Sequence, residues 1–376
     1  MGPSHRGTRI EIRAHLIHEN LEALKKIAGS GFFCPMVKAN AYGHGVENLI
    51  EPVKALGIKD VGVATLDEAI ELRSLQYDRN ILLFSRIHKP TDAQKVKEAG
   101  ITPVVSRFED LALLEKVSDS KIRLSVHVKF DTGIHRMGFA LSEVEPVFDF
   151  FKNSKALQLG GLLTHMSHGE DVNLSPSKTK DQLKKFEGVL AHFSSYELDV
   201  HCLNSMAMLG LSQGGQDISN WGSRPGIAIY GAIPDERLSK QSVMRVVSQI
   251  DHVQRVPQGE GVSYGWSWVA QKDSLVGVIP MGYADGYPRG LANKGEVLIL
   301  GQRAPLVGNI CMDYSLVDLS DLSLPPNLGL DEEVVLLGEQ GSQEIKASEL
   351  AAWNDTISYE MLTGLGIKKN RLEVHS

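Results

Sequence analysis

The stretch that decides the fold is Arg123-Leu124-Ser125-Val126-His127-Val128-Lys129-Phe130-Asp131, in which apolar and polar residues alternate strictly. Successive side chains of a β-strand point to opposite faces, so this strand has one apolar and one polar face. It lies either at the edge of a sheet, with its polar face in water, or in a closed barrel, with that face lining the interior. The predicted interior residues are Ser125, His127, Lys129 and Asp131.

The surrounding sequence favours the barrel, because short apolar runs alternate with amphipathic helical segments from about residue 10 to about residue 240. Eight strand–helix units predict a (β/α)8 TIM-type barrel, whereas a doubly wound sheet, the alternative, usually has fewer strands. The first helix is expected from about Leu16 to Ala28 and to stop at Gly29. Capping boxes are predicted at Thr65…Glu68, Ser106…Glu109 and Ser142…Glu145. The predicted strands are residues 32–37, 61–64, 81–84, 101–105, 124–130, 159–165, 200–203 and 226–230.

Polar residues gather at the C-terminal ends of these predicted strands, which is where barrel enzymes place their chemistry. A lysine in a barrel interior cannot remain an unpaired ammonium ion at acceptable cost. Lys129 is therefore expected to be paired, deprotonated or chemically modified. Lys38, Asp131 and His165 also end predicted strands, Asn204 and Ser205 follow the seventh strand, and Arg224 and Gly226 open the eighth.

After about residue 245 the helical periodicity fades, and strands are expected at 296–300, 315–319 and 333–337. A single helix is expected in this part, beginning near Ser348. The predicted organisation is therefore a barrel over residues 10–240 and a β-rich C-terminal domain over residues 245–376, to which residues 1–9 are added.

Composition narrows the class of protein. The chain has 376 residues and a net charge of −7, which argues against nucleic-acid binding, since that requires basic patches. No apolar run reaches the roughly 18 residues of a membrane span, and the polar N-terminus lacks the apolar core of a signal peptide. Three widely spaced cysteines predict neither a disulfide framework nor a metal site. A cytoplasmic enzyme acting on a small molecule is the expected class.

Five blocks carry a family resemblance that extends over nearly the whole chain. The run Val37-Lys38-Ala39-Asn40-Ala41-Tyr42-Gly43-His44-Gly45 resembles the cofactor-lysine motif of the alanine racemases, which use pyridoxal 5'-phosphate (PLP). Barrel decarboxylases share this motif in part, so the blocks of the second domain are more specific. The remaining blocks are residues 131–138, 224–231, 262–265 with 282–289 (Gly-Tyr-Ala-Asp-Gly-Tyr-Pro-Arg), and 308–313 (Gly-Asn-Ile-Cys-Met-Asp).

The resemblance implies a head-to-tail homodimer in which the C-terminal domain of one subunit completes the active site of the other. It implies that Lys38 carries PLP as a Schiff base and serves as the base on the D-alanine side. Tyr264 of the partner subunit would serve the L-alanine side. By its own sequence context Tyr264 would be assigned a structural role. Supply of D-alanine for peptidoglycan is the biological role that the family implies.

The resemblance also implies the cofactor contacts. Arg224 would hydrogen-bond the pyridine nitrogen, and His165 would lie near the ring and hydrogen-bond Arg224. The phosphate would be held by backbone N–H groups and hydroxyls after the seventh and eighth strands, the usual barrel phosphate site. The cofactor-binding residues are thus Lys38, Tyr42, His165, Asn204, Ser205, Arg224, Gly226, Ile227 and Tyr359.

For the substrate, the resemblance implies a carbamylated Lys129 that holds Arg136, which binds the carboxylate together with the Met312 backbone. Tyr283 and Arg289 would line a narrow corridor that favours alanine over longer side chains. One departure lies there: Asn309 stands where the family usually has arginine. The C-terminal run 362–368 also departs from the usual Arg-Pro-Arg-like ending.

Three alternatives remain open at the level of sequence. A non-catalytic single-barrel PLP carrier would lack the second domain. The motif residues 283–289 and 311–313 lie in that domain and therefore argue against such a carrier. A barrel decarboxylase would ordinarily show a Gly-rich phosphate run, and no Gly-Gly-Gly occurs in the chain. A serine or broad-specificity racemase differs only in pocket size.

Overall fold

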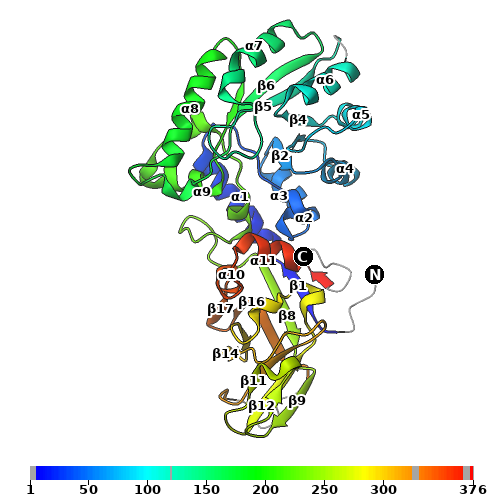
Figure 1. Cartoon of the computed structure of the whole chain (residues 1–376), viewed down its shortest axis with the longest axis vertical. Coiled ribbons are helices and arrows are strands. Elements are labelled where there is room, and N and C mark those ends of the chain that lie inside the picture. The colour runs from blue at the N-terminus through cyan, green and yellow to red at the C-terminus, as the bar shows by residue number, and fades with distance from the viewer. Residues whose placement is uncertain (1–5, 119–120, 324–329, 367–372, 376) are drawn as a thin grey trace. The chain divides into compact units, whose positions relative to one another are not determined.

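The computed structural model describes residues 6–118, 121–323, 330–366 and 373–375, which belong to two compact units. The barrel unit comprises His18–Ala41 and Leu49–Ile229, and the β unit comprises Met1–Ile17, Tyr42–Asn48 and Tyr230–Ser376. Figure 1 shows helices alternating with parallel strands in the barrel unit and mostly strands in the β unit.

In the described part of the barrel unit, six strands form one parallel sheet in the order β2-β3-β4-β5-β6-β7. Each strand is followed by a helical segment, as a parallel connection requires. The strands are β2 (Asp60–Val63), β3 (Asn80–Leu83), β4 (Thr102–Val105), β5 (Leu124–Lys129), β6 (Leu157–Leu163) and β7 (Asp199–His201). The helices are α1 (Ala14–Ala28), α2 (Lys38–Tyr42), α3 (Glu47–Ala55), α4 (Leu66–Ser74), α5 (Pro90–Glu98), α6 (Phe108–Val117), α7 (Val144–Asn153), α8 (Lys178–His192) and α9 (Ser205–Leu211).

Two short segments complete the barrel. Met36 forms a parallel bridge with Gly62 of β2, while Ser223 bridges Phe33 on one side and Leu203, after β7, on the other. The eight strand positions therefore form a closed ring, which confirms the predicted (β/α)8 barrel. The hydrogen bonds that close it run from Val37 N–H to Gly62 O (2.8 Å), Gly62 N–H to Pro35 O (2.8 Å), Cys34 N–H to Ser223 O (2.9 Å), Ser223 N–H to Phe32 O (2.7 Å) and Arg224 N–H to Leu203 O (2.8 Å).

The predicted eighth strand, residues 226–230, was wrong. Ser223 and its neighbours occupy that position, and Ile227–Tyr230 forms the 3₁₀ helix η5. The backbone N–H groups of Gly226 and Ala228 donate to the Ser205 hydroxyl instead of to a neighbouring strand. A short apolar run cannot by itself distinguish a buried strand from a buried helical turn.

The helix-start signals were partly correct. The box at Thr65 is confirmed, because its side chain accepts from Glu68 N–H and the Glu68 carboxylate accepts from Thr65 N–H. Gly29 follows α1 in the left-handed region, as expected. The boxes at Ser106 and Ser142 were wrong, since α6 begins only at Phe108 and the 3₁₀ helix η1 begins at Leu141, which displaces each glutamate from the required position.

The β unit is mainly antiparallel in its described residues. One sheet has the order β14-β13-β16-β8-β1-β18, with β17 paired to β16, and a second has the order β15-β12-β9. The single helix predicted near Ser348 was wrong in number, because a second helix follows after a left-handed residue at Asp355. The elements are β1 (Arg9–Ile12), β8 (Met244–Gln249), β9 (His252–Val256), β10 (Gly261–Val262), β11 (Trp268–Val269), β12 (Ser274–Ile279), β13 (Glu296–Ile299), β14 (Gln302–Pro305), β15 (Ser315–Asp318), β16 (Glu333–Gln340), β17 (Gln343–Ile345), β18 (Glu373–His375), α10 (Ala347–Trp353) and α11 (Ser358–Gly366).

The N-terminal strand β1 belongs to this unit. It pairs antiparallel with β8, with Ile10 opposite Val246, and both side chains are buried. The start of the chain is thus built into the sheet formed by its last third. None of the described helices combines the length and the apolar character needed to cross a membrane.

Barrel closure depends on a glycine that precedes the eighth strand position. Gly222 has φ +47°, and a Cβ there would clash with the Val200 carbonyl oxygen. We expect Gly222→Ala to lower the free energy of unfolding by on the order of 2 kcal/mol or more, through left-handed strain and overpacking. Chemical denaturation of the purified protein measures this.

A matched glycine provides the control. Gly188 is exposed inside α8, and a Cβ added there would meet nothing within 4 Å, so Gly188→Ala should stabilise the protein by roughly 1 kcal/mol. Equal and small effects of the two substitutions would contradict the closure described above.

Candidate active site

Four cationic side chains surround one imidazole at the C-terminal ends of the barrel strands. His165 follows β6, and its pKa lies well below the ordinary value because of burial and the nearby charges of Arg224, Lys129, Arg136 and Lys38. The structure therefore brings together residues from the first, fifth, sixth and eighth strand positions. This strongly positive region is suited to anionic ligands.

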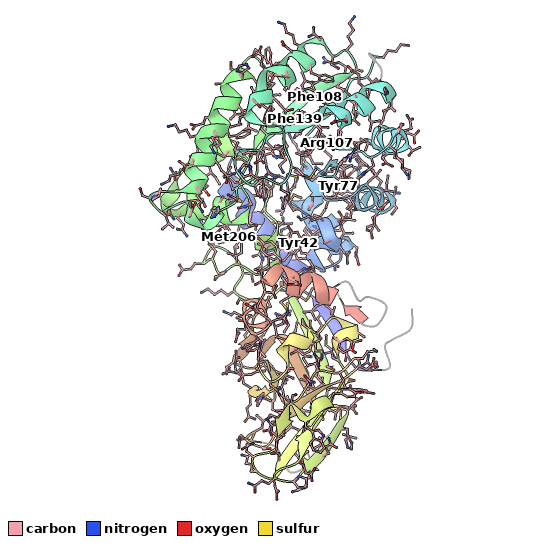
Figure 2. The ribbon with its side chains drawn as sticks, in the orientation of Figure 1. Tyr42, Tyr77, Arg107, Phe108, Phe139 and Met206 are labelled. Atoms are coloured by element: carbon pink, nitrogen blue, oxygen red, sulfur yellow. The ribbon has the colours of Figure 1, made fainter. Side chains whose placement is uncertain are left out.

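The loop after β5 returns to the strand and carries Arg136. Phe139 N–H donates to Lys129 O at 2.8 Å, and Asp131 N–H donates to Phe139 O at 2.9 Å. The Phe139 ring packs edge-to-face on Phe108 of α6, as Figure 2 shows, with ring centroids 5.0 Å apart. The Asp131 carboxylate accepts from the backbone N–H of Gly133, which shapes the turn.

Lys38 begins a left-handed helical turn. Ala39, Asn40, Ala41 and Tyr42 all have φ between 52° and 55°, although none of them is glycine. Each such residue costs roughly 1–2 kcal/mol relative to the right-handed conformation. Surrounding contacts must therefore impose this turn, a situation typical of functional sites.

Glu68 of α4 is the anchor of that turn. Its Oε1 accepts from Ala39 N–H at 2.6 Å, while Oε2 accepts from Ala64 N–H at 2.8 Å and from Thr65 N–H at 3.0 Å. The glutamate of the helix cap thus also fixes the backbone immediately after Lys38. Hydrogen bonds to a carboxylate are roughly twice as strong as neutral ones.

The two interior lysines are both shifted toward the neutral amine. Burial is the main cause for each, and the charge of Arg136 is the second; together they lower the pKa of Lys38 and bring the pKa of Lys129 to about 8. Lys129 is buried, and no ion pair joins it to a carboxylate within the described residues. Among the described residues, burial and the nearby cations thus favour the neutral form of the Lys129 amine.

Arg224 is held from several sides by neutral acceptors. Its Nη1 donates to His201 Nδ1 at 2.9 Å and to His201 O at 2.6 Å. Its Nη2 donates to Thr164 O at 2.7 Å and to His165 Nδ1 at 3.1 Å. Burial lowers the pKa of Arg224 to about 10, so the guanidinium keeps its charge at neutral pH.

A cluster of backbone N–H groups lies beside the start of α9. The Ser205 hydroxyl accepts from Gly226 N–H at 2.9 Å and from Ala228 N–H at 3.3 Å. Asn204 caps α9 by accepting from Ala207 N–H, and its amide nitrogen donates to Met166 O. Ile227 is fully buried in the same segment.

Within the β unit, aromatic rings gather around Tyr42. Its ring centroid lies 4.9 Å from that of Tyr230 and 6.0 Å from that of Tyr359, and the His44 ring stacks on that of Tyr230 at 4.6 Å. Burial is the main reason why the pKa of Tyr42 is raised, with Tyr359 as the second cause. Tyr42 therefore keeps its hydroxyl proton and can donate a hydrogen bond.

The three segments that make up the second-domain blocks, residues 262–265, 282–289 and 308–313, meet at one place in the β unit. Tyr283 N–H donates to Cys311 O at 3.1 Å and Ala284 N–H to Met312 O at 3.0 Å. Tyr264 and Met312 are 74% and 52% exposed, which is unusual for large apolar side chains. Segments separated by almost 50 residues thus present an exposed aromatic and apolar surface.

Asn309, the departure from the family pattern, contacts Tyr264 directly. Its side-chain nitrogen donates to Tyr264 O at 2.6 Å, and the Ser263 hydroxyl donates to Asn309 O at 2.6 Å. An amide here fixes the backbone of the Tyr264 turn, in which Ser263 itself has a positive φ. The position thus holds a backbone anchor in place of a charge.

Comparison with known proteins identifies the family to which this chain belongs. Residues 12–234 match the family "Alanine racemase, N-terminal domain" and residues 243–373 match "Alanine racemase, C-terminal domain". The chain belongs to the alanine racemase family. The resemblance stated from the sequence motifs is therefore confirmed, as is the class of enzyme, an isomerase of the racemase type.

Relatives in this family match along nearly the whole chain. The alanine racemase of Carboxydothermus hydrogenoformans is 34% identical over 97% of this chain and 98% of its own length. The crystal structure of alanine racemase from E. faecalis has a TM-score of 0.86 and 30% identity, covering 99% of this chain and 98% of its own. That of Bacillus anthracis with bound L-Ala-P has a TM-score of 0.84 and 28% identity, covering 97% and 94%.

The predicted alanine racemase residues fall into two sets. Arg289 stands apart in the second set, because it is exposed and no described contact joins its side chain to Tyr264 or Tyr283. No cluster of three or more possible metal ligands is found among the described residues. The barrel unit holds Lys38, Lys129, Arg136, His165, Asn204, Ser205, Arg224, Gly226 and Ile227, and the β unit holds Tyr42, Tyr264, Tyr283, Arg289, Met312 and Tyr359.

Three supporting residues were missed by sequence reasoning. Glu68 was interpreted only as a cap, and His201 was not selected although it ends β7. Arg6 forms an ion pair with buried Asp285 at 3.0 Å and donates to Asp313 O at 2.5 Å, which ties two motif blocks together. The acidic residue in the motif Gly-Tyr-Ala-Asp-Gly could have indicated that a basic partner such as Arg6 was needed. For Glu68, the sequence contained no signal other than the capping box.

The role of Glu68 can be tested with an isosteric change. In Glu68→Gln the side chain cannot accept hydrogen bonds on both of its ends, so either Ala39 N–H or the Ala64 and Thr65 pair loses its acceptor. We expect a loss of about 1–3 kcal/mol in unfolding free energy and faster hydrogen exchange at Ala39.

Glu71→Gln on the exposed side of the same helix removes the same charge without touching the turn, and should change neither quantity. If both variants exchange Ala39 N–H at the wild-type rate, Glu68 does not anchor the Lys38 turn.

Proposed function

We propose that this alanine racemase homologue interconverts L-alanine and D-alanine with PLP, using Lys38 and Tyr264 of the partner subunit as the two bases. The observation that supports it most is the positive barrel end, where Lys38, Lys129, Arg136 and Arg224 converge on His165. The ligands involved, a phosphorylated cofactor and an amino-acid carboxylate, are both anions. The family supplies the reaction type.

The residues present fit PLP. When bound, PLP supplies an electron sink that delocalises the charge left after the Cα proton is removed. Lys38 Nζ would hold its aldehyde, Arg224 its ring nitrogen, and the amides near Ser205, Gly226 and Ile227 its phosphate. Arg224 fits this role because Nη1 and Nη2 are engaged, which leaves its Nε–H as a donor without an assigned partner among the described residues. Asn204 and the hydroxyls of Tyr42 and Tyr359 are proposed to assist at the phosphate.

Proton transfer at both faces of Cα needs two groups that can accept and return a proton. The lowered pKa of Lys38 favours the neutral amine, the form that accepts a proton. Tyr264 is proposed as the opposite group. Its side chain is largely exposed, and a partner subunit that covers it would also desolvate Met312.

A shared site predicts complementation. In mixed dimers of Lys38→Ala and Tyr264→Ala, one site carries both substitutions and the other carries none. After dissociation and equal mixing, about half of the dimers are mixed, so about a quarter of the wild-type racemase activity should return. The measurement is D-alanine formed from L-alanine.

Each variant alone, treated in the same way, is the control and should stay inactive. An inactive mixture that contains mixed dimers would contradict the shared site, as would a fully active wild-type monomer.

Lys129 is proposed to be carbamylated and to hold Arg136 for the substrate carboxylate, with the Met312 backbone of the partner subunit assisting. Carbon dioxide reacts with a neutral amine, and a pKa of about 8 makes that form accessible near neutral pH. A carbamate would place a negative charge among Arg136 and Arg224, which offsets their mutual repulsion.

Lys129→Ala removes this anion and should lower kcat/KM for alanine at least tenfold, with partial rescue by added short carboxylates such as acetate. Lys184→Ala, on the exposed surface of α8, is the control. This variant should keep the wild-type kcat/KM for alanine, and added acetate should not change it. Absence of rescue, together with an unmodified Lys129 side chain in a crystal structure, would overturn the carbamate.

Substrate range is set by the proposed corridor of Tyr283 and Arg289, narrowed by Tyr264. A broader-specificity racemase of the same fold is the competing proposal, which the exchange of the usual arginine for Asn309 keeps open. Incubation with L-alanine, L-serine and L-lysine, followed by measurement of optical rotation, distinguishes an alanine-selective racemase from a broader-specificity one.

Release of carbon dioxide without formation of D-alanine would contradict the proposed racemase reaction altogether. Supply of D-alanine for peptidoglycan and the domain limits 10–240 and 245–376 remain predictions.

A further inference from the structure

Two buried histidines behind Arg224 are not used by the proposed reaction. His127, on the interior face of β5, and His201, at the end of β7, are 3% and 0% exposed. Their ring nitrogens His127 Nδ1 and His201 Nε2 lie 2.8 Å apart, and His201 Nδ1 lies 2.9 Å from Arg224 Nη1. The three side chains thus form one continuous hydrogen-bonded chain across the barrel interior.

The direction of every hydrogen bond in this chain follows from Arg224. A guanidinium has only donors, so His201 Nδ1 must accept from Arg224. His201 then carries its proton on Nε2 and donates to His127 Nδ1, which must accept. His127 is therefore also neutral and carries its proton on Nε2.

The outer end of the chain is compatible with this assignment. His127 Nε2 lies 3.9 Å from the Asp199 carboxylate, which is beyond hydrogen-bond distance. Burial, followed by the charge of Arg224, lowers the pKa of His127 to about 4 and places that of His201 well below its ordinary value. Both imidazoles are therefore neutral over the physiological pH range.

The barrel is shaped around the two rings. Phe32 stacks on His201 with ring centroids 4.5 Å apart. The His127 ring lies against Gly161 of β6, where an added Cβ would stand only 2.6 Å from His127 Nδ1. A glycine in a central strand is unfavourable by itself, and here it provides the space for an imidazole.

We propose that His201 and His127 form a neutral relay, each donating from Nε2, that positions the Arg224 guanidinium. The relay supplies a fixed acceptor to Nη1 without adding a negative charge at this end of the barrel, and it leaves the Nε–H of Arg224 available. Its importance for the cofactor rests on the function proposed above, whereas its proton arrangement does not. His127 does not contact Arg224 and acts only through His201.

The proton arrangement is tested by NMR on cofactor-free protein labelled with ¹⁵N-histidine. Long-range ¹H–¹⁵N spectra should show His127 and His201, together with His165, which also accepts from Arg224, in the neutral Nε2–H form without titration between pH 8 and 5.5. Loss of signals in His127→Gln and His201→Gln assigns the two relay histidines. An Nδ1–H form of His127 or His201, or titration of either near the ordinary pKa of about 6.5, would overturn the relay.

The positioning role is tested with three variants of β5. His127→Leu removes the acceptor for His201 and should lower PLP affinity and kcat/KM about tenfold, the usual effect of one lost hydrogen bond, and shift the absorbance of bound PLP. His127→Gln retains an acceptor and a donor and should keep PLP affinity and kcat/KM close to the wild-type values. Val128→Ala, fully buried on the opposite face of the same strand, is the control for a purely structural loss.

The expected result is a spectral shift in His127→Leu that is absent in Val128→Ala at comparable loss of thermal stability. If both variants change PLP affinity and absorbance in proportion to stability, the histidines are only structural. A wild-type protein with the predicted NMR pattern but no racemase activity would contradict the proposed function and leave the relay intact. Racemase activity in a protein that lacks the predicted NMR pattern would contradict the relay and leave the proposed function intact.

Discussion

The guanidinium of Arg224 is a buried positive charge that makes no ion pair with a carboxylate within the described residues. A buried charge is costly unless its donors are satisfied, so the barrel surrounds it with backbone carbonyls and neutral imidazoles. Thr164 and His165, which follow β6, and His201, which ends β7, supply these acceptors. The segment that carries Arg224 also closes the barrel, so closure of the fold and organisation of the site depend on the same few residues.

That charge also determines the chemistry of its neighbours. Burial, followed by the charges of Arg224 and Arg136, lowers the pKa values of Lys129 and His165, and the same positive charges make the barrel end attractive to anions. The proposed carbamate at Lys129 follows the same electrostatic logic, because it converts one member of a cationic cluster into an anion. The left-handed turn after Lys38 adds a mechanical element, in which the Glu68 carboxylate stabilises a backbone that is unfavourable by itself.

The β unit contributes by a different route. Its motif blocks are joined through backbone hydrogen bonds between the segments at Tyr283 and Cys311, and through the ion pair of Arg6 with Asp285. These internal ties leave Tyr264 and Met312 exposed. Large exposed apolar side chains on a rigid support are typical of an interface, which is consistent with the shared site proposed for a dimer.

The sequence by itself determined the barrel, because a strict alternation in β5 and a period of strand–helix units leave little choice of architecture. It also identified Lys38, Lys129 and His165 as neighbours, since the C-terminal ends of the strands meet in a barrel, whereas Arg224 was assigned to the same site through the family resemblance. It misplaced the eighth strand and two helix caps, where a hydroxyl or a later helix start competes with the local pattern.

Only the tertiary structure decided the left-handed turn at residues 39–42, which contains no glycine to announce it and whose Ala39 N–H donates to Glu68. It likewise decided the proton arrangement of His127 and His201. That depends on a donor-only guanidinium almost 100 residues away in the chain from His127, and such a contact has no local signature. Local periodicity thus specified the scaffold, whereas long-range hydrogen bonds specified the state of the groups inside it.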